Sequence, residues 1–285
     1  MTKVKFGASI LSWIPPKWTA EGGLFAIQKT AGAGFDLLEI LLPPSMDIDT
    51  TTVKRQLKEY NLDAVCTFNL PTSCHIPFYP EVATSMMKAA LNKTAELDLT
   101  FLGGVLHSGI GVFSGKPITE KEEQTVCEVW ADVADYAKKL GITIGVEPIN
   151  RYESYVCTAA TDTLKMIERT GADNMVLHLD TFHMNIEEDN FYDPVIAAGD
   201  RLKHIHMTES NRGMLGEGNV HWDNLFRGLS SIDFTGNLVL ENFTSQVDGM
   251  ASAVSLWRHS KYDADQLAIG SLEFMKAKAA EYGLL

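Results

Sequence analysis

Short apolar runs and longer amphipathic runs alternate along the whole chain. The apolar runs, typical of buried parallel strands, occupy residues 4–11, 36–41, 63–69, 101–107, 142–149, 175–181, 202–208 and 236–243. The amphipathic runs predict helices at 19–32, 51–60, 80–97, 119–140, 159–170, 193–199, 222–229 and in a tail of about 248–282. Because strands alternate with helices, the sheet should be parallel, and eight such units make a closed (β/α)8 TIM barrel.

The turn residues and the even composition indicate a single α/β domain over residues 1–285, with a C-terminal helical tail from about 248. Gly34 is placed to end the first helix, and Pro43-Pro44 prevents extension of the second strand. No linker rich in proline or serine divides the chain. A doubly wound open sheet is the alternative fold. It would call for a glycine-rich phosphate loop after the first strand, and the sequence has none.

Four metal-ligand types of residue stand out in the second half of this pattern. Glu147, Asp180, His206 and Glu241 lie at or near the ends of four successive apolar runs, 33, 26 and 35 residues apart. One βαβ unit takes roughly 30 residues or more, so these residues recur once per unit. Since the C-terminal ends of barrel strands meet at one mouth, the four side chains are expected to converge on one divalent cation.

Each of these four positions also has a plainer explanation when taken alone. A buried carboxylate in an apolar strand is about as often the partner of an arginine or lysine as it is a metal ligand. Four such residues in four consecutive strands favour the metal site. Three carboxylates and one imidazole form an oxygen-rich donor set, which suits Mn²⁺, Mg²⁺ or Co²⁺ better than structural zinc.

A second group of polar residues follows three of these positions. Glu153 and Arg212 each come six residues after a candidate ligand, and His183 comes three residues after one. These offsets place them in the loops that touch substrate in TIM barrels, so we interpret them as substrate-binding residues. A solvated loop residue is the alternative for Glu153 or Arg212 alone.

The remaining histidines and the aromatic residues near strand ends are weaker candidates. His107, Trp13 and Phe243 are predicted substrate contacts, and Phe68 is another possible apolar wall. Strand alternation puts His178 on the face of Asp180 and His204 on the face of His206. Both are then one layer deeper and are interpreted as packed or supporting core histidines. His221 and His259 are expected at the surface or in helices.

Composition excludes several classes of partner. The formal net charge of −13 disfavours nucleic acid and anionic membranes, while a small neutral substrate is easier to accommodate. No apolar run approaches the roughly 20 residues that span a bilayer. The four cysteines form no C-x-x-C pair, and the N-terminus has no signal-peptide pattern. We therefore expect a cytoplasmic protein without a disulfide framework.

Several segments together carry a family resemblance. Residues 180–188 read Asp-Thr-Phe-His-Met-Asn-Ile-Glu-Glu, a specific run that resembles the ketose 3-epimerases acting on D-tagatose, D-allulose and L-ribulose. Residues 147–153, 206–212, 215–218 and 257–258 add to the likeness, which extends over most of the chain. These enzymes belong to the sugar isomerase/epimerase TIM barrels, which also include endonuclease IV relatives.

The resemblance implies a role for each candidate. Bound Mn²⁺, or alternatively Co²⁺ or Mg²⁺, would be held by Glu147, Asp180, His206 and Glu241. The sugar would be contacted by Glu153, His183 and Arg212. The resemblance also implies a homodimer or homotetramer. Departures from the family pattern at 66–71, at 109–112 and at Asn242, where proline is usual, leave the preferred ketose open.

The implied reaction is metal-dependent epimerisation of free ketoses at C3 through a cis-enediolate intermediate. Glu147 and Glu241, from strands five and eight, would be the catalytic pair that removes and returns the C3 proton on opposite faces of the sugar. Other activities on this barrel stay open: an aldose–ketose isomerase, a dehydratase of polyols or dehydroshikimate, or a sugar-binding barrel with a structural metal. A phosphodiesterase of the endonuclease IV type would require a basic face, which the charge of −13 opposes.

Overall fold

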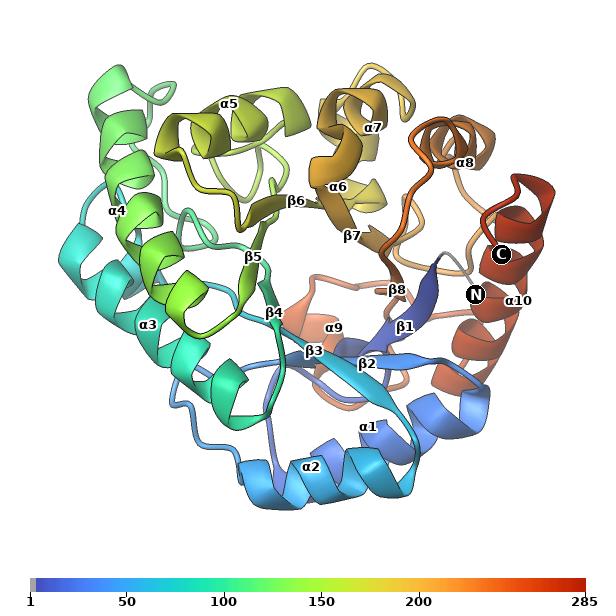
Figure 1. Ribbon diagram of the computed structural model, residues 1–285. Helices are drawn as coiled ribbons and strands as arrows, with labels where there is room; N and C mark the ends of the chain where they lie inside the picture. Colours follow the sequence, from blue (N-terminus) through green and yellow to red (C-terminus); the bar gives the residue numbers. More distant parts are fainter. Residues whose placement is uncertain (1–3) are drawn as a thin grey trace.

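The computed structural model describes residues 4–285 and contains a closed barrel of eight parallel strands (Figure 1). In chain order the strands are β1 (Lys5–Ser9), β2 (Leu37–Leu41), β3 (Asp63–Thr67), β4 (Phe101–Gly103), β5 (Thr143–Val146), β6 (Met175–Asp180), β7 (Leu202–Met207) and β8 (Asn237–Leu240). The barrel closes where β1 pairs in parallel with β8, with Gly7 opposite Val239. The predicted (β/α)8 TIM barrel is therefore confirmed, and the open-sheet alternative is wrong.

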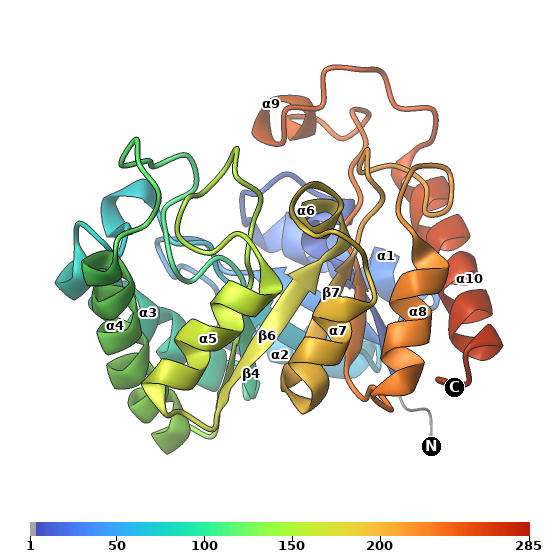
Figure 2. The ribbon, with the colours of Figure 1, turned by 90° about the horizontal axis from the view of Figure 1, so that it is seen from above.

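Most of the helices surround this barrel on its outside (Figure 1), whereas α6 and α9 lie at the end with the long loops (Figure 2). The helices are α1 (Ala20–Ala33), α2 (Thr50–Glu59), α3 (Pro80–Glu96), α4 (Glu120–Lys139), α5 (Ala160–Thr170), α6 (Thr181–Glu187), α7 (Asp193–Ala198), α8 (Trp222–Ser231), α9 (Met250–Ala253) and α10 (Ala264–Glu281). Short 3-10 turns occur at Ile10–Ser12, Thr72–Cys74 and Gly199–Arg201. No helix within residues 4–285 has the length and apolarity needed to cross a membrane.

Local sequence explains where the longest helices begin. Thr119 and Glu122 form a reciprocal capping box at the start of α4, and Asp263 and Gln266 form another at the start of α10. Each cap satisfies backbone N–H groups that a helix start leaves without partners, a contribution of about 1 kcal/mol. Gly34 ends α1 with φ +88°, a left-handed conformation that glycine adopts without strain.

Most strands are shorter than predicted, and three differences from the prediction are larger. The fourth strand is only Phe101–Gly103, because Gly104 turns away at φ +113° with its α-carbon close to the backbone of Phe68. The helix at Thr181–Glu187 was not predicted. The tail is not one helix, since residues 254–263 separate α9 from α10. Asp263 accounts for the new start because its side chain caps α10.

The strand ends define one functional face of the molecule. Figure 2 shows α9 and the long loops at one end of the barrel, with the C-terminus at the other. β5 ends at Val146 and β8 at Leu240, so Glu147 and Glu241 come one residue after their strands, at the end of the barrel that the βα loops surround. The barrel thereby brings polar residues from distant parts of the chain to one mouth.

Candidate active site

Three of the four predicted metal ligands lie within one small cluster. Candidate ligand atoms of Glu147, Asp180 and His206 are all within 4.8 Å of one another, and all three residues are buried. The Nδ1 atom of His206 is 3.2 Å from Oε1 of Glu147. Glu241 falls outside that group of three, although its Oε2 is 3.7 Å from the same Nδ1 atom. Four consecutive strands thus bring the predicted residues together.

Arg212 explains the position of Glu241. Its guanidinium is 3.1 Å from Oδ2 of Asp180 and also forms an ion pair with Glu241. The guanidinium also lies over two aromatic rings, with Cζ 4.1 Å from the centre of Phe182 and 4.9 Å from that of Phe243. Phe243, predicted to contact substrate, therefore packs against the arginine.

The buried carboxylates of the cluster would be stabilised by a positive charge between them. Burial raises the pKa of Glu147, and it raises the pKa of Glu241 to about 7 against the opposing effects of His206 and Arg212. Burial also favours a neutral Asp180, but Arg212 and His183 hold its pKa below the usual value. These three buried carboxylates and one imidazole are a donor set that fits a divalent cation such as Mn²⁺, Co²⁺ or Mg²⁺.

The protonation of His206 supports the same conclusion. Burial lowers the pKa of this imidazole, yet the carboxylates of Glu39, Glu241 and Glu147 together raise it well above the ordinary value. The surrounding carboxylates therefore favour a proton, and with it positive charge, on this ring. A divalent cation fits this place because it would supply that charge instead of the proton.

His183 is oriented by a neighbour that the sequence did not single out. Its Nδ1 atom accepts the backbone N–H of Asn150 at 3.2 Å and the side-chain amide of Asn150 at 2.8 Å. Burial lowers the pKa of His183 to about 3, so the ring is neutral and its proton is on Nε2. Nε2 is 3.6 Å from Oδ2 of Asp180. The amide of Asn150 also donates to Glu153 at 2.9 Å, which connects Glu153 to His183.

The weaker substrate candidates have different surroundings. His107 is buried, its Nε2–H donates to the backbone carbonyl of Glu147 at 3.1 Å, and its Nδ1 has no hydrogen-bond partner within residues 4–285. The indole N–H of Trp13 donates to Thr30 of α1 at 2.9 Å, and the ring packs in the hydrophobic core with 3% of the residue exposed. Phe68 is fully buried in the core.

The deeper histidines are located as predicted. His178 and His204 are fully buried, and their rings pack edge to face with centres 4.4 Å apart. His178 also packs against His206, with ring centres 4.2 Å apart. His221 and His259 are exposed, as expected.

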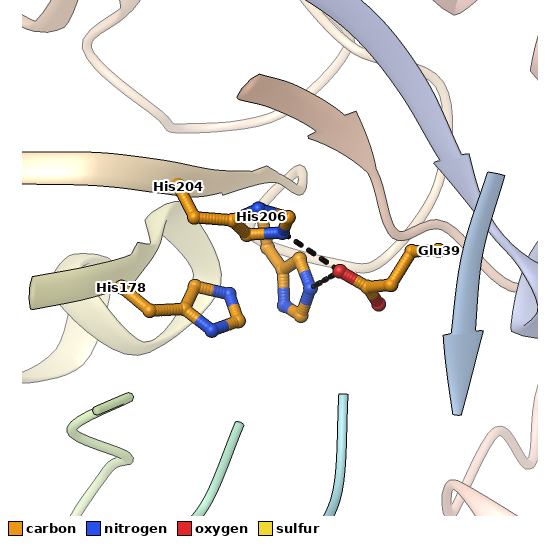
Figure 3. Close-up of side chains that lie close together, drawn as sticks. All are labelled: Glu39, His178, His204 and His206. Atoms are coloured by element: carbon orange, nitrogen blue, oxygen red, sulfur yellow. Dashed lines mark hydrogen bonds and ion pairs between the residues drawn. The ribbon is translucent and has the colours of Figure 1, made fainter. Parts of the chain in front are cut away.

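Glu39 is a member of this group that sequence reasoning missed. Its Oε2 atom accepts N–H bonds from Nε2 of His204 at 2.7 Å and from Nε2 of His206 at 2.8 Å (Figure 3). Burial would raise the pKa of Glu39, but these imidazoles hold it below its usual range. A charge inside the apolar run Leu-Leu-Glu-Ile-Leu at 37–41 was the available signal.

Comparisons with known proteins agree with this geometry. A family model described as a xylose isomerase-like TIM barrel matches residues 27–278. The chain is 34% identical to the L-ribulose 3-epimerase of Methylomonas sp. over 282 residues, 97% of this chain and 98% of that protein. It is 32% identical to the ketose 3-epimerase of Arthrobacter globiformis, covering 96% of each. A crystal structure of the D-allulose 3-epimerase from Methylomonas sp. in complex with D-allulose is 33% identical, with a TM-score of 0.90 over 98% of both chains.

Proposed function

Because this chain belongs to the ketose 3-epimerases among the xylose isomerase-like TIM barrels, we propose that it epimerises free ketoses at C3. The observation that carries the proposal is the convergence of Glu147, Asp180 and His206 on one buried point, with Glu241 beside His206. These four residues would hold a divalent cation, with Mn²⁺ as the first choice and Co²⁺ or Mg²⁺ as alternatives. The bound cation would supply Lewis-acid stabilisation of negative charge on the sugar oxygens.

The two glutamates on either side of His206 are the proposed acid–base pair. Glu147 follows β5 and Glu241 follows β8, and their carboxylates approach Nδ1 of His206 at 3.2 and 3.7 Å. Epimerisation requires that a proton leave C3 on one face and that a proton return on the other face. One glutamate accepts the proton as the carbanion is delocalised into a cis-enediolate, and the other, protonated, donates to C3 from the opposite side. Each such transfer is worth roughly 10²–10⁴-fold in rate.

The surrounding polar groups would bind and orient the sugar. Arg212 and His183 present a guanidinium and an Nε2–H donor beside Asp180, where they oppose negative charge that develops on the oxygens. Glu153 acts through the Asn150 amide, which holds the His183 ring. We assign His107 as a further substrate contact because its buried Nδ1 is an acceptor without a partner in the described structure.

Two aromatic residues complete the predicted substrate set. Phe243 would contribute chiefly by holding Arg212, whose Cζ lies 4.9 Å from the centre of its ring. Trp13 would offer an apolar wall, since its indole N–H already bonds Thr30. We also propose that the enzyme is a cytoplasmic homodimer or homotetramer folded as a single domain, which size-exclusion chromatography with light scattering would test for assembly.

Proton NMR of candidate sugars tests the reaction. D-Fructose, D-tagatose and L-ribulose are each incubated with Mn²⁺-loaded enzyme in D₂O. The proposal predicts deuterium at C3 together with the C3 epimer. Label at C1 or C2 with an aldose product would identify an aldose–ketose isomerase, and loss of water would identify a dehydratase.

Variants of the two glutamates test the acid–base assignment. Glu147→Gln and Glu241→Gln, each loaded with Mn²⁺ to the wild-type level, are expected to lose turnover beyond any loss of metal. A metal-loaded variant with near-normal turnover would remove that glutamate from the catalytic pair.

A further inference from the structure

The carboxylate of Glu39 lies inside the barrel, one layer below the proposed metal ligands. It comes from the middle of β2, on the opposite side of the barrel from β6. Only 1% of Glu39 is exposed, and one oxygen accepts both imidazole N–H bonds (Figure 3). Burial of an ionised carboxylate costs free energy unless the carboxylate is hydrogen bonded. The two bonds to Glu39 should therefore hold both imidazole rings in fixed orientations.

We propose that Glu39 is a positioning residue that holds His206 with its proton on Nε2 and its Nδ1 atom directed at the metal site. This inference rests on the proposed function, because it assumes that His206 is a metal ligand. The 2.8 Å bond from Nε2 of His206 to Glu39 makes Nε2 the protonated nitrogen of the neutral ring. The lone pair is then on Nδ1, the atom that lies 3.2 Å from Glu147 and 3.7 Å from Glu241.

The negative charge of Glu39 would also strengthen His206 as a ligand. An imidazole that donates its far N–H to a carboxylate is a more basic donor on its near nitrogen, and its ring cannot rotate. A neutral acceptor in place of Glu39 would keep the shape of the site but lose that polarisation. The effect of Glu39 on the metal would therefore pass through His206.

His204 holds Glu39 in place for this role. Its Nε2–H donates to the same carboxylate oxygen at 2.7 Å. The ring of His204 is itself fixed, because it stacks on Phe101 with centres 5.0 Å apart and planes 15° apart. The Nδ1 atom of His204 lies 3.4 Å from the amide of Asn237 on β8. Strands β2, β7 and β8 thus share one buried polar connection.

The same residues could instead form a second cation site. Candidate ligand atoms of Glu39, His178, His204 and His206 lie within 4.8 Å of one another, and neither ring nitrogen of His178 has a hydrogen-bond partner within residues 4–285. The positioning role is favoured because Nε2 of His204 and Nε2 of His206 already donate protons to Glu39. A nitrogen that carries a proton has no lone pair for a metal.

Mn²⁺ binding distinguishes these possibilities without any measurement of activity. Metal content after dialysis and the dissociation constant of Mn²⁺ are measured for the wild type, for Glu39→Gln and for Glu188→Gln. Glu188 is the control because its carboxylate is partly buried and accepts a backbone N–H at the start of α5, from Ala160 at 2.7 Å, instead of an imidazole N–H. We expect one Mn²⁺ per chain, a roughly 10- to 100-fold weaker affinity in Glu39→Gln, and wild-type affinity in Glu188→Gln.

The outcomes separate the inference from the proposed function. One Mn²⁺ bound with equal affinity by the wild type and Glu39→Gln would overturn the positioning role and leave the metal site intact. Two Mn²⁺ per chain, with the second absent in Glu39→Gln, would also overturn it, in favour of a deeper cation site. No Mn²⁺ bound to the wild type would overturn the proposed metal site itself.

A second measurement keeps the inference testable if Glu39→Gln does not fold. Nitrogen-15 NMR of the histidine rings in metal-free wild-type enzyme, at a pH high enough for His206 to be neutral, reports which nitrogen of this ring carries the proton when Glu39 and Glu147 compete for it. A proton on Nε2 supports the positioning role, and a proton on Nδ1 overturns it. A purely structural contribution of Glu39 to packing would not determine this tautomer.

Discussion

Glu209 organises the loop that carries Arg212, and its replacement should destabilise the protein strongly. The side chain is fully buried. Its two oxygens accept four N–H groups at 2.9–3.0 Å, from the backbones of Ser210, Gly216 and Val220 and from the indole of Trp222. The backbone N–H of Arg212, a residue at φ +60°, bonds the carbonyl of Glu209 at 2.8 Å. The carboxylate therefore holds the whole turn between β7 and α8.

The magnitude follows from these four bonds. Glu209→Gln keeps one acceptor oxygen and replaces the other by an NH₂ group, so two N–H donors lose their partner and face another donor. Hydrogen bonds to a charged group contribute about 1.5–3 kcal/mol each. The free energy of unfolding should therefore fall by about 3–6 kcal/mol, and the midpoint of thermal unfolding by roughly 5–10 °C.

Urea denaturation followed by circular dichroism measures this loss. Glu217→Gln is the matched control, since Glu217 lies in the same loop but is exposed, and its carboxylate bonds Lys261 and Tyr262 at the surface. We expect little change in this control because exposed ion pairs are weak. A loss of less than about 1 kcal/mol in Glu209→Gln would refute the reasoning from buried charged hydrogen bonds.

Three further predictions concern the site and its scaffold. Asn150→Ala should lower kcat/KM about tenfold without changing the Mn²⁺ dissociation constant. The reason is that His183 keeps one of its two bonds from Asn150, and Glu153 loses its bond from the Asn150 amide. Unchanged kinetics with a tested sugar would contradict this prediction. Gly104→Ala should destabilise the protein by at least about 2 kcal/mol in urea denaturation, because an added methyl would lie 2.5 Å from the carbonyl oxygen of Phe68. Wild-type stability of this variant would contradict the close approach of Gly104 to Phe68. Removal of metal by a chelator should lower the thermal midpoint, and Mn²⁺ at about 100 times its dissociation constant should restore about 2.7 kcal/mol; a midpoint that is insensitive to Mn²⁺ would speak against a cation in the cluster.

The fold could be predicted from local pattern because buried parallel strands and amphipathic helices have different periods. The eight apolar runs are short and apolar on both faces, and each is followed by a helix, which is the pattern of a closed barrel. Strand ends were less predictable. β5 ends at Val146, although the N–H of Glu147 still bonds the carbonyl of Gly104, the residue at which the backbone after β4 turns to a positive φ.

The helix at Thr181–Glu187 illustrates a second limit. Asp180 caps it by accepting the N–H of Phe182, so one residue is both a helix start and a candidate ligand. In the sequence Asp180 was interpreted only as a ligand at the end of a strand. The helix that follows is seven residues long, too short for a clear periodic signal.

The residues of the site likewise fall into those that the sequence predicted and those that it did not. The regular spacing of candidate ligands along the chain was enough to predict that Glu147, Asp180 and His206 lie together, because parallel strands in a barrel end at one mouth. The partners of these residues came from elsewhere. Glu39 reaches His206 from 167 residues away along the chain, and no periodic pattern connects the two positions.

The sequence by itself thus determined which strands exist and which of their ends carry chemistry, since both depend on neighbours within about one βαβ unit. Only the tertiary structure decided which donor meets which acceptor: Glu39 with His206, Asn150 with His183, and Arg212 with Asp180 and Glu241. The physical reason is barrel closure. It places β2 across from β6 and β7, and each buried polar group then depends on the few partners within its reach.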